Sequence, residues 1–369
     1  MFINFWYPAE LASAVTTKPV RVKLLGQNFV VFRDAQGLPH CLANTCVHRC
    51  GSLSHGWTEG NNIVCPYHGW RFAGDGQCVR IPSLGPGVGA LPTRARVDAY
   101  PTVERYGIVF VFLGDLPDEE RVPILPISEW GDAGWRSTVV SWVFKANWLR
   151  VMDNALDLTH PEYVHMFGLK GKDPNWHVPD YPIDADQYGA YATLRSKPPP
   201  PSGIWRHLRK QGTEVESSTG FHGLNHVKTS IRITPRAVVL QYLYEAPIDE
   251  LTTRTFMVSA RSFLRTRWLD SGANQRNMRV VEEDRAILEQ LDPVRGSVST
   301  NEDFSMRSDA LSVHYRHRVA EYQARGWRID LAALRASSQG TQHHVIPSPA
   351  RRHSASWVFP PVPLLARGA

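Results

Sequence analysis

The chain has 369 residues, of which 43% are hydrophobic and 21% charged, a composition typical of a globular protein with one large or two ordinary domains. No stretch approaches the about 20 uninterrupted apolar residues of a membrane-spanning helix, and the N-terminus lacks the order of a signal peptide, so we expect a cytoplasmic protein. The net charge of +6 is scattered rather than gathered into a basic run with interleaved aromatics, which argues against nucleic acid as a partner.

The first third of the chain alternates short β-rich runs with Gly, Pro, Asn and Asp, a pattern that predicts a mostly antiparallel β domain. The predicted strands are 20–25, 29–32, 63–65, 70–72, 78–81 and 107–113. A segment rich in Pro, Asp and Glu follows at 114–126. We therefore expect one domain over residues 1–116 and a second over 117–369.

The second domain is predicted to be mixed α+β, with a sheet between long helices. Apolar residues at helical spacing predict a helix over 144–160, which ends before Pro161. The other predicted elements are strands at 227–233, 237–245 and 252–260 and helices at 279–291 and 307–325. The tail from 337 is expected to be irregular or docked on the surface.

Two short motifs in the β domain pair cysteine with histidine. Cys46-Val47-His48 is followed, after sixteen residues, by Cys65-Pro66-Tyr67-His68. Two thiolates and two imidazoles on matched loops suit a [2Fe–2S] cluster in which the cysteines hold one iron and the histidines the other. Tetrahedral zinc is the alternative, although zinc ligands more often come in C-x2–4-C and H-x3–5-H pairs. The other three cysteines, Cys41, Cys50 and Cys78, are expected to be small buried hydrophobic residues.

A second group of polar residues follows the predicted helix at 144–160. Steps of three place Asn154, Asp157 and His160 on one helical face, and Pro161 lets the chain turn so that His165 returns toward His160. Two histidines and one carboxylate form the facial triad that leaves open positions on Fe(II). The acids at 282–284 are candidates for the carboxylate, and only one of them can face inward.

These motifs resemble the signature C-x-H…C-x-x-H of Rieske proteins, and Arg49 after the first histidine is similar to the oxygenase branch of that family. The resemblance implies that Cys46 and Cys65 hold one iron of the cluster and that His48 and His68 hold the other. It also implies the family's fold, an N-terminal antiparallel β Rieske domain followed by an α+β helix-grip (START/Bet v 1-like) catalytic domain.

The spacing Asn154-x-x-Asp157-x-x-His160-x4-His165 is similar to the iron motif of the catalytic domains of Rieske oxygenases. The segment from Glu283 to Glu289 resembles the E-D-(K/R)-x-(I/V)-(L/V)-E stretch of the smaller monooxygenases, which implies Asp284 as the third iron ligand, with Glu283 as the second choice. In the family the working pair of centres spans two subunits of a head-to-tail trimer. The Asp157 carboxylate would then form hydrogen bonds to His160 of its own chain and to His68 of the partner subunit. Asn154 would lie next to the iron ligands without binding the iron.

The resemblance implies a terminal oxygenase of the compact homotrimeric branch, which uses O2 to hydroxylate or oxidatively demethylate a small organic substrate. Aromatic cis-dihydroxylation is the alternative, and a pure electron carrier would need neither His160 nor His165. The glycines at 85, 87 and 89 do not open a helix, so no dinucleotide site is expected and a separate reductase or ferredoxin must supply electrons. Candidate substrate-pocket residues are Trp205, His207, Phe221, His222, Asn225 and His226.

Overall fold

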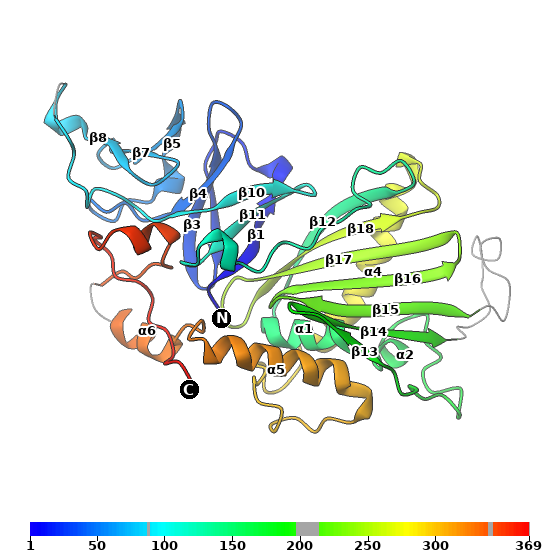
Figure 1. Cartoon of the computed structure of the whole chain (residues 1–369). Coiled ribbons are helices and arrows are strands. Elements are labelled where there is room, and N and C mark those ends of the chain that lie inside the picture. Colours follow the sequence, from blue (N-terminus) through cyan, green and yellow to red (C-terminus); the bar gives the residue numbers. More distant parts are fainter. Residues whose placement is uncertain (87–88, 197–213, 339–341, 369) are drawn as a thin grey trace. The chain divides into compact units, whose positions relative to one another are not determined.

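The computed structural model describes residues 1–86, 89–196, 214–338 and 342–368 (Figure 1). The chain divides into two compact units, of which the first comprises Met1–Ile124 with Tyr322–Ala369 and the second comprises Leu125–Glu321. The predicted boundary after residue 116 placed the C-terminal segment in the second domain, whereas this segment belongs to the first unit. A division read along the chain cannot foresee a segment that returns to the N-terminal half.

The first unit contains three antiparallel sheets. Their strand orders are β1-β11-β10, β2-β3-β4-β9 and β5-β6-β7-β8. The strands are β1 (Phe5–Leu11), β2 (Val20–Leu24), β3 (Gln27–Arg33), β4 (Pro39–Ala43), β5 (Trp57–Glu59), β6 (Asn62–Val64), β7 (Arg71–Ala73), β8 (Cys78–Arg80), β9 (Ala99–Tyr100), β10 (Thr102–Arg105) and β11 (Ile108–Leu113).

The predicted β domain is confirmed, and all six predicted strands are present within one or two residues of their expected bounds. Every residue of β11 is buried, as its unbroken apolar run Ile-Val-Phe-Val-Phe-Leu requires of a central strand. The prediction missed β1, which contains Pro8. This proline lies where the register between β1 and β11 shifts, a place at which a sheet tolerates a residue without an N–H donor.

The C-terminal segment packs on the first unit through a small number of directed contacts. The Arg351 guanidinium donates to both carboxylate oxygens of Asp98 at 2.7 Å, and the Ser348 hydroxyl donates to the same carboxylate at 2.8 Å. The Trp357 ring is contacted by the guanidinium groups of both Arg96 and Arg351, at 4.2 and 4.5 Å from its centroid. The helix α6 (Leu331–Ser338) precedes this segment.

The second unit is built on a seven-stranded antiparallel sheet of order β12-β18-β17-β16-β15-β14-β13. Its strands are β12 (Arg136–Phe144), β13 (Ile183–Ala185), β14 (Gly189–Ser196), β15 (Val215–His222), β16 (His226–Thr234), β17 (Ala237–Pro247) and β18 (Thr253–Arg261). The helices are α1 (Trp148–Leu156), α2 (Pro161–Val164), α4 (Asp270–Leu288) and α5 (Ala310–Ala324).

One face of this sheet packs against α1 and α4 (Figure 1). Trp142, Phe144 and Met257 on the sheet meet Val151 of α1 and Val281 of α4 in one buried apolar cluster. This arrangement is the expected α+β architecture, in which a long helix lies across a curved antiparallel sheet. The three predicted strands between 227 and 260 are confirmed as β16, β17 and β18.

The helix predicted over 144–160 was too long at both ends. Phe144 is the last residue of β12, and Asn147 caps α1 by accepting a hydrogen bond from the Leu149 N–H at 3.1 Å. The chain leaves the helix after Leu156 and begins α2 at Pro161, a favourable first helical residue. The prediction also began α4 nine residues late, because its first turns are polar and lack an apolar periodicity.

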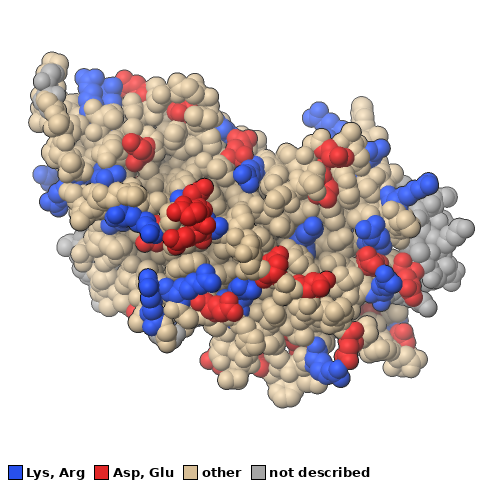
Figure 2. All heavy atoms as spheres, viewed as in Figure 1, with Lys and Arg blue, Asp and Glu red and all other residues tan. Residues whose placement is uncertain are grey.

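Among the described residues, no helix combines the length and apolar character needed to cross a bilayer. Cationic and anionic side chains are interspersed over the face shown in Figure 2, without a continuous basic track. This distribution agrees with the scattered charges of the sequence.

Candidate metal centres

The two cysteine-histidine loops of the first unit have the same backbone form. In each loop the N–H four residues after the cysteine donates to the cysteine carbonyl, from Cys50 to Cys46 at 2.9 Å and from Gly69 to Cys65 at 3.0 Å. Both donors have a positive φ, 55° for Cys50 and 69° for Gly69. The two loops are therefore copies of one tight turn, and they present their side chains as a matched set.

The cysteines of these loops are buried next to each other, and their thiols share a hydrogen bond. The Cys46 thiol donates this bond and so stabilises the Cys65 thiolate, which lowers the pKa of Cys65 and raises the pKa of Cys46. A Cβ on Gly51 would lie 2.9 Å from the Cys65 sulfur, so only glycine fits beside it. The two sulfurs are close enough to bind one iron.

The histidines of the same loops are exposed and adjacent. The rings of His48 and His68 lie 4.5 Å apart between centroids, and the Trp70 ring stacks on His48 at 4.6 Å. Partial desolvation in the loop, together with the nearby His68 and Arg49, lowers the pKa of His48, and the neutral imidazole is the form that binds a metal. A buried sulfur pair beside an exposed imidazole pair suits a cluster whose histidine-bound iron lies at the surface.

Of the remaining cysteines, Cys41 and Cys78 are buried as predicted. The prediction was wrong for Cys50, which is exposed. Its place in the tight turn after His48 explains the difference, since the backbone there turns outward with a positive φ.

In the second unit, His160, His165 and Asp284 converge. Each offers one ligand atom, and the three atoms lie within 4.8 Å of one another. The Nε2 atoms of both histidines lie 3.5 Å from the same oxygen, Asp284 Oδ1. The histidines flank α2 and the aspartate lies on α4, so residues more than a hundred positions apart in the chain meet here.

The Nδ1 atoms of the two histidines face groups that can only accept a hydrogen bond. His160 Nδ1 lies 3.1 Å from the carbonyl oxygen of Asp157, and His165 Nδ1 lies 3.0 Å from Glu283 Oε2. Each Nδ1 must therefore carry the proton in a neutral ring, which leaves the lone pair on Nε2. Two lone pairs and a carboxylate oxygen thus point into one space, an arrangement that a divalent cation stabilises.

Glu283, the second choice for the third iron ligand in the sequence, does not face the other ligand atoms. Its carboxylate accepts from His165 and from the Met166 backbone N–H, at 3.2 Å from each oxygen, and it is absent from the converging ligand group. The structure therefore favours Asp284 as the carboxylate that faces the histidines. Sequence reasoning missed the contact with His165, and the only signal for it was that two acids stand side by side on α4.

Asn154 and Asp157 both lie next to this group. The Asn154 amide lies 3.4 Å from Asp284 Oδ1. The Asp157 carboxylate accepts from the backbone N–H and the hydroxyl of Thr159 at 2.6 and 2.7 Å, and its other oxygen lies 3.7 Å from His160 Nδ1. Thr159 thereby fixes the Asp157 side chain.

The predicted substrate-pocket residues fall into two groups. Trp205 and His207 lie outside the described residues. Phe221, His222, Asn225 and His226 are all buried, around the turn between β15 and β16. His226 stacks on Tyr244, and burial lowers its pKa well below the usual value, so its ring is neutral. A role for these four residues in substrate binding stays a prediction.

Two protein families match the chain. Residues 5–101 match the Rieske [2Fe-2S] domain, and residues 144–325 match the vanillate O-demethylase oxygenase C-terminal domain. The first match overturns the zinc alternative, and the second covers a domain that a pure electron carrier would lack.

Curated relatives point to the same family. The chain is 31% identical over 264 residues to a 4beta-methylsterol monooxygenase from Methylococcus capsulatus. This alignment covers 69% of this chain and 67% of that protein. The chain is 33% identical over 164 residues to the oxygenase component of dicamba O-demethylase from Stenotrophomonas maltophilia. That alignment covers 44% of this chain, and it spans less than half, 47%, of the dicamba protein.

Solved structures share the fold. Dicamba monooxygenase bound to dicamba aligns with a TM-score of 0.73 at 22% identity, over 86% of this chain and 96% of that chain. The QL mutant of the Pseudomonas putida CBB5 protein NdmA with theobromine aligns with a TM-score of 0.72 at 21% identity, over 87% of this chain and 91% of that chain. Together with the two cysteine-histidine loops and the converging triad, these matches show that the chain belongs to the Rieske oxygenase family. It is an oxygenase with a Rieske cluster and a domain that in this family binds mononuclear iron.

Proposed function

We propose that this chain is the terminal oxygenase of a multi-protein system, and that it hydroxylates or oxidatively demethylates a small organic substrate. The observation that carries this proposal is the convergence of the two Nε2 lone pairs and Asp284 Oδ1. A site with three protein ligands leaves positions open for other molecules, which distinguishes a catalytic from a structural metal. Aromatic cis-dihydroxylation remains the alternative reaction.

In this proposal Cys46, His48, Cys65 and His68 hold the cluster, and His160, His165 and Asp284 hold the mononuclear iron. When bound, the iron supplies open positions for O2 beside the substrate, and the cluster supplies electrons one at a time. The chain's own residues fix the geometry. The Asp157 carbonyl and the Glu283 carboxylate hold the histidine rings with Nε2 inward, and the Asn154 amide restrains the Asp284 carboxylate.

The family takes its electrons from separate reductase or ferredoxin proteins. For this chain we propose such a partner, a head-to-tail homotrimer and a cytoplasmic location. The exposure of His48 and His68 supports an intersubunit route, since the cluster's histidine side is open to a neighbouring chain. Asp157 would form the bridge, with its carboxylate between its own His160 and His68 of the partner subunit.

The proposed substrates are small aromatic or heterocyclic molecules that carry a methoxy, N-methyl or oxidisable carbon group. The names of the relatives support this class: one is a dicamba O-demethylase, and another, from Comamonas testosteroni, is a putative toluene-4-sulfonate monooxygenase iron-sulfur subunit. One relative, the 4beta-methylsterol monooxygenase, does not fit this class, so a methylsterol is added to the screen below.

The test is a substrate screen with a surrogate reductase, in which O2 uptake, formaldehyde release and 18O incorporation are measured together. Oxidative demethylation gives formaldehyde in step with O2 uptake, and hydroxylation places one labelled oxygen atom in the product. A diol with both atoms of one O2 molecule would support cis-dihydroxylation instead. Absence of any substrate-dependent O2 uptake across the class, from protein with both centres loaded, would contradict the proposal.

A further inference from the structure

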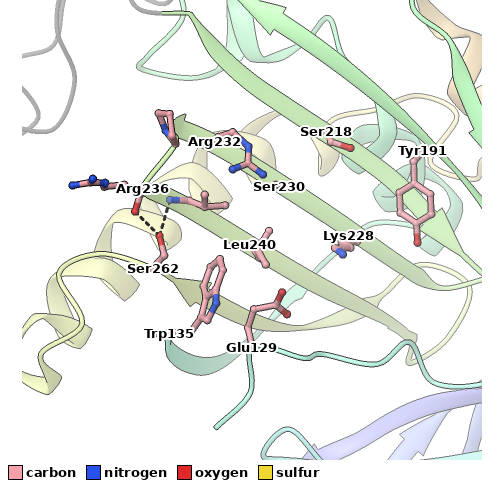
Figure 3. A pocket seen from close by; sticks show the side chains of 12 residues that line it. Glu129, Trp135, Tyr191, Ser218, Lys228, Ser230, Arg232, Arg236, Leu240 and Ser262 are labelled. Carbon is pink, nitrogen blue, oxygen red and sulfur yellow. Dashed lines mark hydrogen bonds between the residues drawn. The ribbon is translucent and has the colours of Figure 1, made fainter. Parts of the chain in front are cut away.

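The second unit has a cavity of about 610 Å³ that the metal site does not use (Figure 3). It lies on the sheet, and we call it the outer-face cavity. Its lining residues come from β14 to β17 and from the segments next to β12 and β18.

Strand alternation places this cavity on the face opposite the metal site. On the helix-covered face, the Thr219 hydroxyl contacts the Thr229 hydroxyl at 3.2 Å and the Ala155 carbonyl of α1 at 3.3 Å. Ala155 adjoins Asn154, whose amide reaches Asp284. Lys228 and Ser230 flank Thr229 along β16, so they point to the other face. A ligand in the outer-face cavity therefore cannot touch the mononuclear iron.

Small residues in the middle of the sheet create the hollow. Ser218 of β15 pairs with Ser230 of β16, and Gly220 pairs with Lys228 two residues farther along the two strands. A Cβ on Gly220 would lie 2.3 Å from the Tyr191 ring, which shows that this ring lies directly over the glycine. Tyr191 and Trp135 are the large aromatic side chains of the lining, and Figure 3 shows Leu240 and Lys228 between them.

The charge of the lining is cationic. The lining carries three cationic side chains, Lys228, Arg232 and Arg236, and a single carboxylate, Glu129, whose Oε2 already accepts from the Tyr242 hydroxyl at 2.9 Å. The Arg232 guanidinium lies 3.4 Å from Glu216, but Arg232 is exposed and Glu216 is partly exposed, so this ion pair holds the guanidinium only weakly.

We propose that the outer-face cavity is a second binding site, for a small aromatic carboxylate. Arginine binds a carboxylate with two parallel hydrogen bonds, and Lys228 and the hydroxyls of Ser218 and Ser230 add further donors. Trp135, Val238 and Leu240 offer apolar surface for a ring, which an inorganic anion would leave unused. The volume lies within the range of about 300 to 1,000 Å³ for small-molecule sites. This proposal does not depend on the reaction at the metal site.

The test uses 4-iodobenzoate as the probe, with the uncharged 4-iodobenzyl alcohol as its control. We expect an anomalous iodine peak in the outer-face cavity of soaked crystals, and saturable binding of the acid in solution by calorimetry. The double variant Lys228→Gln/Arg232→Gln should weaken this binding by at least about tenfold and remove the iodine peak. The exposed Arg267→Gln variant should bind as the wild type does.

Several results would overturn the proposal. They are the absence of iodine from the cavity, equal binding of the alcohol, and an iodine peak unchanged in the double variant. A peak in crystals without saturable binding in solution would mean binding at crystal concentration only, and would overturn it as well. An iodine peak near Asp284 reports on the substrate pocket and is scored separately, so the two proposals can fail independently.

Discussion

In the proposed metal site, Glu283 would act through the ring of His165 rather than as a ligand of the metal. Its carboxylate lies 3.0 Å from His165 Nδ1 and also accepts from the Met166 N–H, so it fixes both the ring and the backbone beside it. A carboxylate behind a ligating imidazole raises the basicity of the ligand and selects its tautomer. In the proposed metal site the neighbouring acids would therefore have different roles, Glu283 orienting a ligand and Asp284 serving as one.

Glu283→Ala should weaken Fe(II) binding at the mononuclear site by about 10- to 100-fold, the usual effect of losing such a partner. Glu283→Gln keeps a hydrogen-bond acceptor and should lose less. The measurement is Fe(II) titration of protein that retains its cluster, with the visible spectrum of the cluster as the control. Equal Fe(II) affinity in all three proteins would show that His165 is held without Glu283.

Glu245 is a second residue with an unusual environment. Its side chain is fully buried in β17, one oxygen accepts from the Thr255 hydroxyl at 2.5 Å, and burial raises its pKa to about 8. Between its unfolded pKa near 4.5 and about 8, the folded chain keeps a proton that the unfolded chain has lost. Glu245 therefore makes the protein less stable as the pH rises through this window.

Glu245→Gln should remove this loss, because the amide is neutral at every pH. The stability of the variant relative to wild type should rise with pH by up to about 1.4 kcal/mol per pH unit inside the window. Urea unfolding at about pH 5 and about pH 8 measures the difference. A variant whose advantage does not change with pH would show that Glu245 ionises freely in the folded protein.

At the scale of elements, the C-terminal segment stabilises the first unit through one buried carboxylate. Asp98 is 3% exposed and accepts from Arg351 and from both the hydroxyl and the N–H of Ser348. Removing one partner of a buried ion pair leaves a charge without its counterpart, which costs about 3 kcal/mol or more. The C-terminal segment therefore contributes to the stability of the first unit through these contacts to Asp98.

Arg351→Gln should lower the melting temperature of the first unit, and Arg352→Gln is the matched control because Arg352 is exposed next to it. The loss of about 3 kcal/mol should appear as a fall of several degrees. Circular dichroism and the visible absorbance of the cluster report the transition. Equal melting of the two variants would mean that the Asp98 contact contributes no net stability.

The elements that the sequence predicted well are those whose pattern is local. The runs at 237–245 and 252–260 are apolar enough to be recognised as strands, whereas β14 and β15 are rich in Ser, Thr and Gly and were missed. The cysteine-histidine loops could be recognised from residue spacing alone, because the cysteine and the histidine of each pair lie on the same turn. The choice of Asp284 needed a family resemblance, since nothing in the sequence shows which acid of α4 faces His160.

At the scale of the whole molecule, the proposed pairing of centres depends on Asp157. Thr159 holds its carboxylate through two hydrogen bonds, and one oxygen lies toward His160. The side chain remains 30% exposed, which leaves room for a contact from outside the unit.

Asp157→Asn should leave both metals and the visible spectrum of the cluster intact while it lowers turnover strongly. The matched control is Asp303→Asn, which alters another acid of the second unit that pairs with Arg316 rather than with a histidine. Single-turnover measurements separate electron transfer from substrate binding. Turnover of Asp157→Asn equal to wild type would show that Asp157 does not connect the two metal centres.

The most direct test of the two-centre account is iron and acid-labile sulfide analysis, combined with electron paramagnetic resonance of the reduced protein, in wild type and His160→Ala. The account predicts about three irons and about two sulfides per chain in wild type, with a Rieske signal. It predicts about two irons, unchanged sulfide and the same signal in His160→Ala. Loss of the signal together with the third iron, or a full iron count in the variant, would contradict it.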